Sequence, residues 1–201
     1  MNQSIFNKYG KDPLALFGRW LAEAEKAEPN DPEAFCLASC GANSQPSARM
    51  LLLKGFDERG FKFHTHAHSR KGHDFYENNK VAMCFYWKST RKQVRIEGVI
   101  EEATNAESDE YFTTRPRARQ IGAWASQQSK PLENPEALET AVKKYEQEFA
   151  GKDILRPQDW KGYRIKPYSI EFWIGHEHRL HTRFVYTKKT DGTWDAGWLN
   201  P

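Results

Sequence analysis

Short apolar segments separated by turns of a few residues recur along this chain, and their spacing restricts the folds available to it. The runs 41–44 and 57–60 are rich in turn-forming residues. Connections this short join antiparallel strands in hairpins. About seven strands are therefore expected in all. Five lie at 34–39, 48–54, 61–65, 80–87 and 93–103, and the last two or three lie near 162–173, 183–187 and 194–199.

Helices are inserted between these strands at irregular intervals. Asp12 and Pro13 open the first, and Leu14, Phe17 and Trp20 follow at helical spacing. A doubly wound sheet needs regular alternation of strands and helices, which is absent here. The sequence predicts an α+β fold in which a β-barrel carries peripheral helices. One domain is expected over residues 1–201, with 1–11 as a flexible segment. Further helices are expected at 70–79, at 106–114, in a segment that starts at 116, and at 135–149.

The composition favours a compact ligand over a long polymer. The 201 residues include 7 Trp, 8 Tyr and 12 Phe, and the formal net charge is only +3. Basic residues are in excess only in local clusters, which suits phosphates better than nucleic acid. No apolar run reaches the roughly 20 residues of a membrane span, no leader-like segment opens the chain, and the three cysteines form no known motif. We expect a soluble cytoplasmic protein that binds neither membranes nor nucleic acid.

Two basic clusters lie at the ends of predicted elements. Arg49 and Lys54 flank the apolar run 50–53, and such cations either extend to solvent or line an anion site. Arg70 and Lys71 follow Ser69 at the start of a helix, where free N–H groups and the helix dipole favour a phosphate. The second cluster indicates phosphate binding, whereas the first leaves both interpretations open.

A third cluster surrounds Pro116 and contains Tyr111, Arg115, Arg117 and Arg119. Tyr111 and Arg115 are four residues apart, so they would share a helix face. A solvated turn or a nucleic-acid patch is an alternative, but no basic stripe or recognition module accompanies the cluster. Nucleic-acid binding is therefore the weaker interpretation.

Near the C-terminus, Arg179, His181 and Arg183 alternate along the sequence. In an extended segment they would point the same way. They could then grip an anionic or electron-rich ring and supply a group that titrates near neutrality. A solvated strand face is the alternative.

The three alternating histidines His64, His66 and His68 would also share a strand face. No Asp, Glu or Cys stands near them in a metal-binding pattern. No functional metal is therefore expected.

In order and spacing, these segments resemble the pyridoxamine (pyridoxine) 5′-phosphate oxidase family. The likeness extends over nearly the whole chain, from residue 12 to residue 201. Each motif is weak alone, but together they are highly specific. The motifs are SARMLLLKG at 47–55, SRKG at 69–72, QVR at 93–95, RPR at 115–117, QIGAW at 120–124, QQS at 127–129 and RLH at 179–181.

The resemblance implies an FMN-binding split β-barrel that forms a homodimer, with the flavin in a cleft between subunits. The substrate phosphate would be taken by Lys54, Tyr111 and Arg115, while Arg179 and His181 would cover the substrate ring opposite the flavin. FMN would be held by residues of both subunits, namely Arg49, Met50, Leu51, Leu52, His64, Thr65, Arg70, Lys71, Gln93, Gln128, Ser129, Trp173 and Arg183.

The implied reaction oxidises the C4′ carbon of pyridoxamine or pyridoxine 5′-phosphate to give pyridoxal 5′-phosphate. Hydride would pass to flavin N5, and O₂ would reoxidise the flavin with release of hydrogen peroxide. Arg179 and His181 are expected to act by positioning and charge, with His181 as a proton acceptor as a further hypothesis. Two phosphate-bearing ligands need two cationic pockets, in agreement with the separate basic clusters.

Three features depart from the family pattern. The chain starts too late to hold the basic and aromatic segment that often covers the substrate, so no such lid is expected. Arg119 replaces a small hydroxyl residue at the substrate phosphate; it would still donate hydrogen bonds there, but its length would shift the pocket. His64 replaces a tyrosine, although its backbone would still serve the flavin.

Two other functions remain open on the same barrel. One is a related flavin oxidoreductase with another substrate, such as a phenazine-pathway oxidase or a flavin reductase. The other is a non-catalytic carrier or sensor of FMN or pyridoxal phosphate. Lys54 and the run 115–117 favour a phosphorylated substrate, and Arg179 with His181 favours catalysis over carriage.

Overall fold

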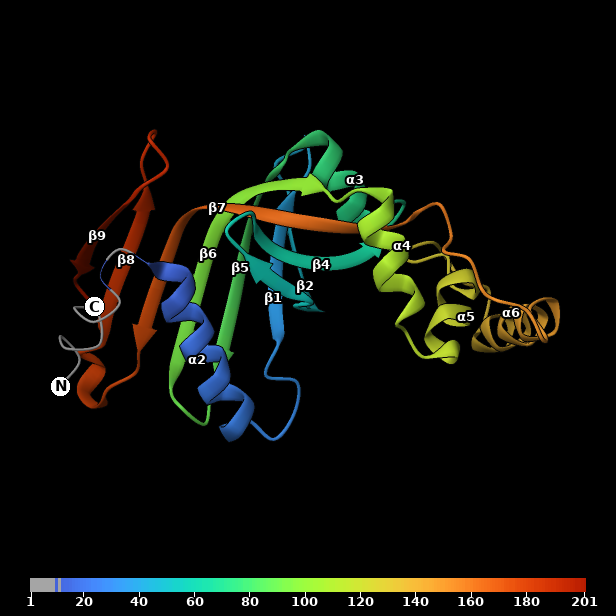
Figure 1. Cartoon of the computed structure of the whole chain (residues 1–201), viewed down its shortest axis with the longest axis horizontal. Helices are drawn as coiled ribbons and strands as arrows, with labels where there is room; N and C mark the ends of the chain where they lie inside the picture. Colours follow the sequence, from blue (N-terminus) through green and yellow to red (C-terminus); the bar gives the residue numbers. More distant parts are fainter. Residues whose placement is uncertain (1–9, 11) are drawn as a thin grey trace.

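Nine strands form one curled antiparallel sheet in the computed structural model, which describes Gly10 and residues 12–201 (Figure 1). The strand order is β2-β1-β5-β6-β7-β4-β3, and β8 and β9 extend the sheet from β7. The strands are β1 (Ala34–Cys40), β2 (Pro46–Leu52), β3 (Gly55–Asp57), β4 (Gly60–His66), β5 (Lys80–Trp87), β6 (Lys92–Glu102), β7 (Trp160–Ile174), β8 (Thr182–Lys188) and β9 (Trp194–Leu199).

The long strand β7 connects the two ends of the sheet. Its first half pairs with β4, from Trp160 opposite His66, and its second half pairs with β8, ending with Ile174 opposite Thr182. The register with β6 shifts at Gly98, where an added Cβ would meet Lys166 O at 2.4 Å. A bulge of this kind bends a strand, and it lies where β7 changes partners between β4 and β8.

The main core lies between the sheet and helix α2 (Pro13–Ala27). Asp12 accepts a hydrogen bond from the Ala15 N–H group at 2.9 Å, which caps the helix as its position predicts. Phe17 is fully buried and contacts Phe61 edge-on, with ring centroids 5.0 Å apart. The apolar face predicted from helical spacing therefore holds α2 against the sheet.

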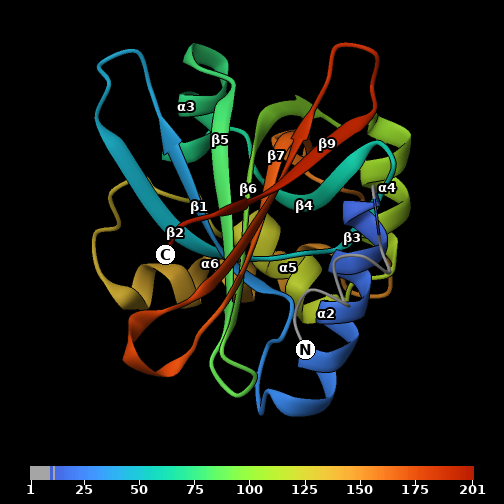
Figure 2. The same ribbon diagram turned by 90° about the vertical axis from the view of Figure 1, so that its left-hand side faces the viewer.

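A second group of helices lies at the end of the sheet where β7 begins (Figure 1). Phe112, Ile121 and Trp160 form a small separate core there. Figure 2 shows the β8–β9 hairpin in front and this helical region behind, at the opposite end of the sheet. Helix α3 (Arg70–Glu77) contributes Phe75 to the main core. The helices outside it are α4 (Asn105–Thr113), α5 (Arg117–Ala125) and α6 (Pro135–Glu148).

The predicted α+β barrel with peripheral helices is confirmed, with some corrections to its elements. The structure has nine strands where about seven were expected, because all three C-terminal segments are strands and the short strand β3 lies just before the predicted turn at 57–60. The second strand ends at Leu52, so Lys54 lies beyond it. The flexible segment predicted for 1–11 lies outside the described residues apart from Gly10. Within the described chain, no helix has the length and apolar character needed to cross a membrane.

Candidate functional site

A cavity of about 670 Å³ opens between the sheet and helices α4 and α5. It brings together residues that are far apart in the sequence, because β2, β4 and the α4–α5 connection meet at this end of the barrel. All four residues predicted to bind the substrate phosphate line it: Lys54, Tyr111, Arg115 and Arg119. Several predicted flavin residues line it too: Met50, Leu51, Leu52, His64, Thr65 and Gln128.

Stacked rings form one wall of this cavity. The His64 ring lies 4.1 Å from that of Tyr111 and 4.9 Å from that of Trp160, with nearly parallel planes in both pairs. The Arg115 guanidinium lies over the Trp160 ring at 4.7 Å. Helix α4 ends at Thr113, so Arg115 and Tyr111 do not share a helix as predicted, although both reach the cavity.

Arg115 presents an open donor at this wall. Its Nη1 atom is buried and has no hydrogen-bond partner among the described residues. A buried donor without a partner is costly, and an anionic ligand in the cavity would satisfy it. Trp160 was not singled out in the sequence, because only the pairing of β7 with β4 places it beside His64.

The cavity is electropositive, but the His64 ring in its wall stays uncharged near neutral pH. Burial and the nearby Lys62 and Arg115 charges lower the pKa of His64 to about 4. Burial also lowers the pKa of Lys54, with Glu33 and Arg119 acting on it in opposite directions. The uncharged imidazole can therefore stack in the wall, while the cations remain available for a phosphate.

A second cavity, of about 350 Å³, adjoins the first and shares Gln128 with it. Three predicted phosphate ligands line it, namely Arg49 from β2 and Arg70 and Lys71 from the start of α3. Ser129 lies opposite, on the segment after α5. The predicted cofactor cluster is thus assembled from three separate parts of the chain.

Lys71 is buried in this second site and already positioned. Its Nζ atom donates to Gln128 Oε1 at 2.6 Å, to Thr65 Oγ1 at 3.0 Å and to Ser69 Oγ at 3.1 Å. Burial and the nearby charge of Arg49 together lower the pKa of Lys71 to about 8, against the opposing effect of Asp74. Ser69 also caps α3 by accepting from the Gly72 N–H group, and a Cβ at Gly72 would lie 2.0 Å from Ala67 O. The SRKG motif therefore encodes a tight turn into the helix as well as two cations.

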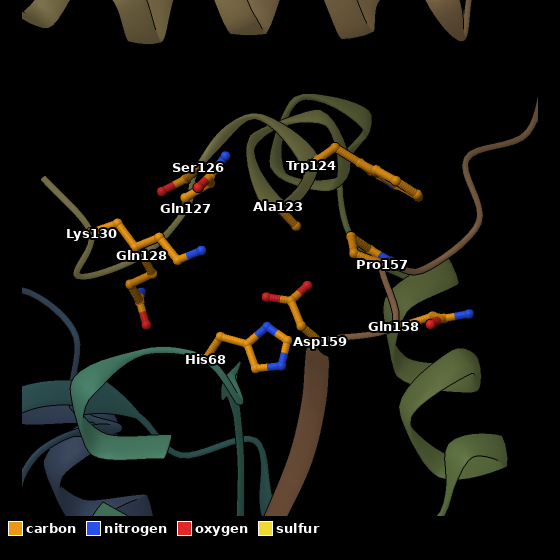
Figure 3. Close-up of a pocket in the computed structure, with 10 residues that line it drawn as sticks. All are labelled: His68, Ala123, Trp124, Ser126, Gln127, Gln128, Lys130, Pro157, Gln158 and Asp159. Carbon is orange, nitrogen blue, oxygen red and sulfur yellow. The ribbon is translucent and has the colours of Figure 1, made fainter. Parts of the chain in front are cut away.

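A third cavity, of about 530 Å³, also has Gln128 in its lining (Figure 3). Figure 3 shows His68 and Asp159 facing Ala123 and Trp124 across it. Asp159 also pairs with His66 Nδ1 at 3.0 Å. No three His, Cys, Asp or Glu side chains gather as a metal site would require in the part of the chain that the structure describes.

The predicted C-terminal residues form a separate group on the β7–β8 side. Gln93, Trp173 and Arg183 lie side by side on three paired strands. Arg183 donates to both carboxylate oxygens of Glu171, at 2.8 and 3.0 Å. His181 lies against Trp173, with ring centroids 4.6 Å apart. This group holds the other half of the predicted site.

The extended conformation expected for the segment that carries Arg179, His181 and Arg183 is wrong. Arg179 ends the short 3₁₀ turn Glu177–Arg179, and both it and His178 have positive φ angles, 63° and 58°. Only Arg183 belongs to β8. Non-glycine residues rarely adopt this conformation, so the chain bends sharply and presents Arg179 and His181 from a turn.

The cavities beside α4 and α5 and the C-terminal group on β7 and β8 lie at opposite ends of the folded chain (Figure 1). Trp160 is the first residue of β7 and Trp173 the last but one, and 13 residues of strand span at most roughly 40 Å. Neither Arg179 nor His181 lines the cavities described above. A single chain therefore does not bring all the predicted site residues together.

Sequence comparisons cover both ends of the chain. Residues 21–149 match the family model described as pyridoxamine 5′-phosphate oxidase, and residues 160–201 match that of the pyridoxine 5′-phosphate oxidase C-terminal dimerisation region. The pyridoxine/pyridoxamine 5′-phosphate oxidase of Chelativorans sp. (strain BNC1) is 47% identical over 201 residues, which is 100% of this chain and 96% of that protein. The protein of the same name from Brucella canis is 50% identical over 191 residues, 94% of each chain.

Solved structures agree with the fold. PhzG from Burkholderia lata 383, solved in complex with tetrahydrophenazine-1-carboxylic acid, superposes with a TM-score of 0.91 at 31% identity, covering 98% of this chain and 96% of that one. A pyridoxamine 5′-phosphate oxidase-related, FMN binding protein from Nostoc punctiforme gives a TM-score of 0.75 at 16% identity, covering 94% and 98%. The second likeness bears on the fold alone.

Proposed function

Because the chain belongs to the pyridoxamine 5′-phosphate oxidase family, we propose that it uses FMN to oxidise pyridoxamine or pyridoxine 5′-phosphate to pyridoxal 5′-phosphate. The observation that carries this proposal is the presence of two adjoining cationic cavities that share Gln128. One suits the phosphate of a cofactor and the other the phosphate of a substrate. The family's dimerisation region supports a homodimer, and we place it in the cytoplasm as a single domain over residues 1–201.

The residues of the smaller cavity fit the FMN phosphate. Lys71 is buried with its ammonium group fixed, and Arg49 and Arg70 line the same space. A dianionic phosphate there would offset the mutual repulsion of these cations. Thr65, Gln128 and the 50–52 segment would hold the rest of the flavin. FMN held there would supply the acceptor for a hydride equivalent from the substrate, with O₂ as the final electron acceptor and hydrogen peroxide as its product.

The larger cavity would hold the substrate by its phosphate. Lys54, Tyr111, Arg115 and Arg119 line it, and the open Nη1 donor of Arg115 needs an acceptor. Fixing the phosphate at one end of a small rigid molecule restricts where its C4′ carbon can lie. The protein thereby contributes orientation, which is one of its main means of accelerating cofactor chemistry.

Arg179 and His181 would reach this cavity from the second subunit of the homodimer. The Nδ1 atom of His181 accepts a hydrogen bond from the His176 backbone N–H at 3.2 Å. With that nitrogen engaged as an acceptor, the ring N–H would lie on Nε2 and would serve a ligand as a donor. This supports a positioning role for His181 over that of a proton acceptor.

An absorbance spectrum of the purified protein tests the proposal. The bands of oxidised flavin should be present, should bleach when pyridoxamine 5′-phosphate is added without oxygen, and should return in air. A flavin that does not respond would favour another substrate, with tetrahydrophenazine-1-carboxylic acid as the first to try because PhzG was solved with it. A protein that binds no flavin, even after reconstitution with FMN, would refute the proposal.

A further inference from the structure

The Arg49 guanidinium is fixed on one side by a closed network of hydrogen bonds. Its Nη1 atom donates to Ser39 Oγ at 2.7 Å and to Leu37 O at 3.1 Å, and its Nη2 atom donates to Ser47 Oγ at 2.5 Å. Both serine hydroxyls then donate to one carboxylate oxygen, Asp74 Oδ2, at 2.5 and 3.0 Å. Asp74 thus determines the orientation of both hydroxyls that hold the guanidinium.

The network joins two elements that must be aligned. Ser39 and Ser47 are direct partners on β1 and β2, and Arg49 follows Ser47 on the same side of β2. Asp74 lies on α3, one turn after Arg70 and Lys71. The carboxylate therefore ties the strand that carries one cation to the helix that carries the other two.

We propose that Asp74 is a positioning residue for the FMN phosphate, acting on Arg49 through Ser39 and Ser47. The inference rests on the proposed function, since it concerns the cofactor assigned there. A guanidinium has five N–H groups, and the hydrogen bonds above leave the Nε and one Nη2 group of Arg49 for a ligand. Arg49 and Lys71 line the same cavity.

The acidic side chain is placed so that it supports the cations without occupying their donors. Asp74 Oδ2 is 3.7 Å from Arg49 Nη2, beyond direct hydrogen-bond distance. Its charge raises the pKa of Arg49 and of Lys71, against the lowering caused by burial and by neighbouring cations. Asp74 therefore stabilises a cluster of like charges while the phosphate is absent, so the site is formed before the cofactor arrives.

A carboxylate close to a phosphate would also repel it. The direction in which removal of Asp74 changes FMN affinity therefore distinguishes positioning from repulsion. If positioning dominates, removal of Asp74 weakens FMN binding. If simple repulsion dominates, the same change tightens it. Glu77 offers a matched control, because it is an acid on the same helix that instead accepts from the Ala42 N–H group at 2.8 Å.

The test measures FMN binding to apoprotein by quenching of flavin fluorescence. Asp74→Ala should raise the FMN Kd about tenfold, as expected for loss of a hydrogen-bonded support to a charged group. The pair Ser39→Ala with Ser47→Ala should do the same, and combining all three changes should add little, because they act through one network. Glu77→Ala should change the Kd less than about twofold.

Riboflavin distinguishes positioning from a general effect on the fold. It lacks the phosphate, so Asp74→Ala should leave its affinity nearly unchanged. Equal losses for FMN and riboflavin, or unchanged or tighter FMN binding by Asp74→Ala, would overturn the inference. Should the alanine variant fail to fold, the isosteric Asp74→Asn, which keeps one acceptor oxygen, should give a smaller loss in the same direction, and no loss in it would overturn the inference equally.

The wild-type titration separates this inference from the proposed function. A wild-type protein that binds FMN, alongside an Asp74→Ala protein that binds it equally well, refutes only the role of Asp74. A wild-type protein that does not bind FMN refutes both.

Discussion

His64 and Tyr111 stack with ring centroids 4.1 Å apart and planes only 10° from parallel. The stack extends to Trp160, so a histidine stands within an aromatic wall between the sheet and α4. A protonated imidazole would add a charge beside Lys54 and Arg115 in a buried place. The wall therefore depends on keeping this ring neutral.

The stability of the protein should fall in mild acid because of His64. The folded state holds the His64 pKa at about 4, against 6.5 in the unfolded chain. Between these values the unfolded state binds more protons, so stability is lost as the pH falls from 6.5 towards 4, by up to about 3 kcal/mol. Urea unfolding at several pH values across this window would measure the slope.

His64→Phe is the matched control, because it keeps a flat ring in the stack but cannot titrate. This variant should lose less stability over the same pH range. An identical pH profile in the two proteins would show that other groups cause the acid sensitivity.

FMN affinity should decrease in alkaline solution because of Lys71. Its pKa of about 8 in the free protein means that the ammonium loses its proton as the pH rises above 8, and with it much of its attraction for a phosphate. The Kd should then rise by up to about tenfold per pH unit. Lys71→Arg should remove this dependence, since arginine stays protonated. A wild-type Kd that is constant from pH 7 to pH 10 would contradict the assignment of Lys71 to the phosphate.

Arg115→Ala should weaken substrate binding selectively. Loss of charge-assisted hydrogen bonds worth about 1.5–3 kcal/mol would raise the KM for pyridoxamine 5′-phosphate by roughly 10- to 150-fold. Steady-state kinetics with pyridoxamine 5′-phosphate and with pyridoxamine would measure the change in KM, which should nearly vanish for pyridoxamine. Arg117→Ala is the neighbouring control, because Arg117 donates to the Phe149 and Lys152 carbonyls after α6. A similar KM in both variants would argue against a phosphate contact by Arg115.

Arg179→Ala should impair turnover while leaving the flavin bound. The residue lies on a turn outside the cavities that contain the basic clusters, so its loss should not release FMN. A misplaced substrate ring should lower kcat by roughly 100-fold. Visible absorbance reports the flavin and peroxide formation reports turnover. A colourless variant would show that Arg179 serves the cofactor instead.

Much of this architecture was predictable because its signals are local. Asp12 with Pro13, and Ser69 with Gly72, mark helix starts that the structure contains. The basic clusters stood out because isolated cations beside apolar runs are unusual. Their separation into two cavities followed from the idea that two phosphates need two sites, not from any single motif.

The parts of the site that the sequence did not predict depend on contacts between distant segments. Asp74 meets Ser39 and Ser47 only because α3 lies over the β1–β2 pair, and Trp160 meets His64 only through strand register. The alternation expected around Arg179 failed because two residues with positive φ bend the chain where an extended segment was expected. Spacing rules apply only after the local backbone conformation is known.

Strand β7 separates the two halves of the predicted site, since it carries Trp160 at one end and Trp173 at the other. This separation can be tested by combining two variants. In a homodimer with shared sites, each chain would give one half to each site. Subunits bearing Arg115→Ala and subunits bearing Arg179→Ala would then complement each other. A mixed dimer would combine both lesions in one site and leave the other wholly intact, so two impaired proteins would together recover up to about half the wild-type activity per mixed dimer.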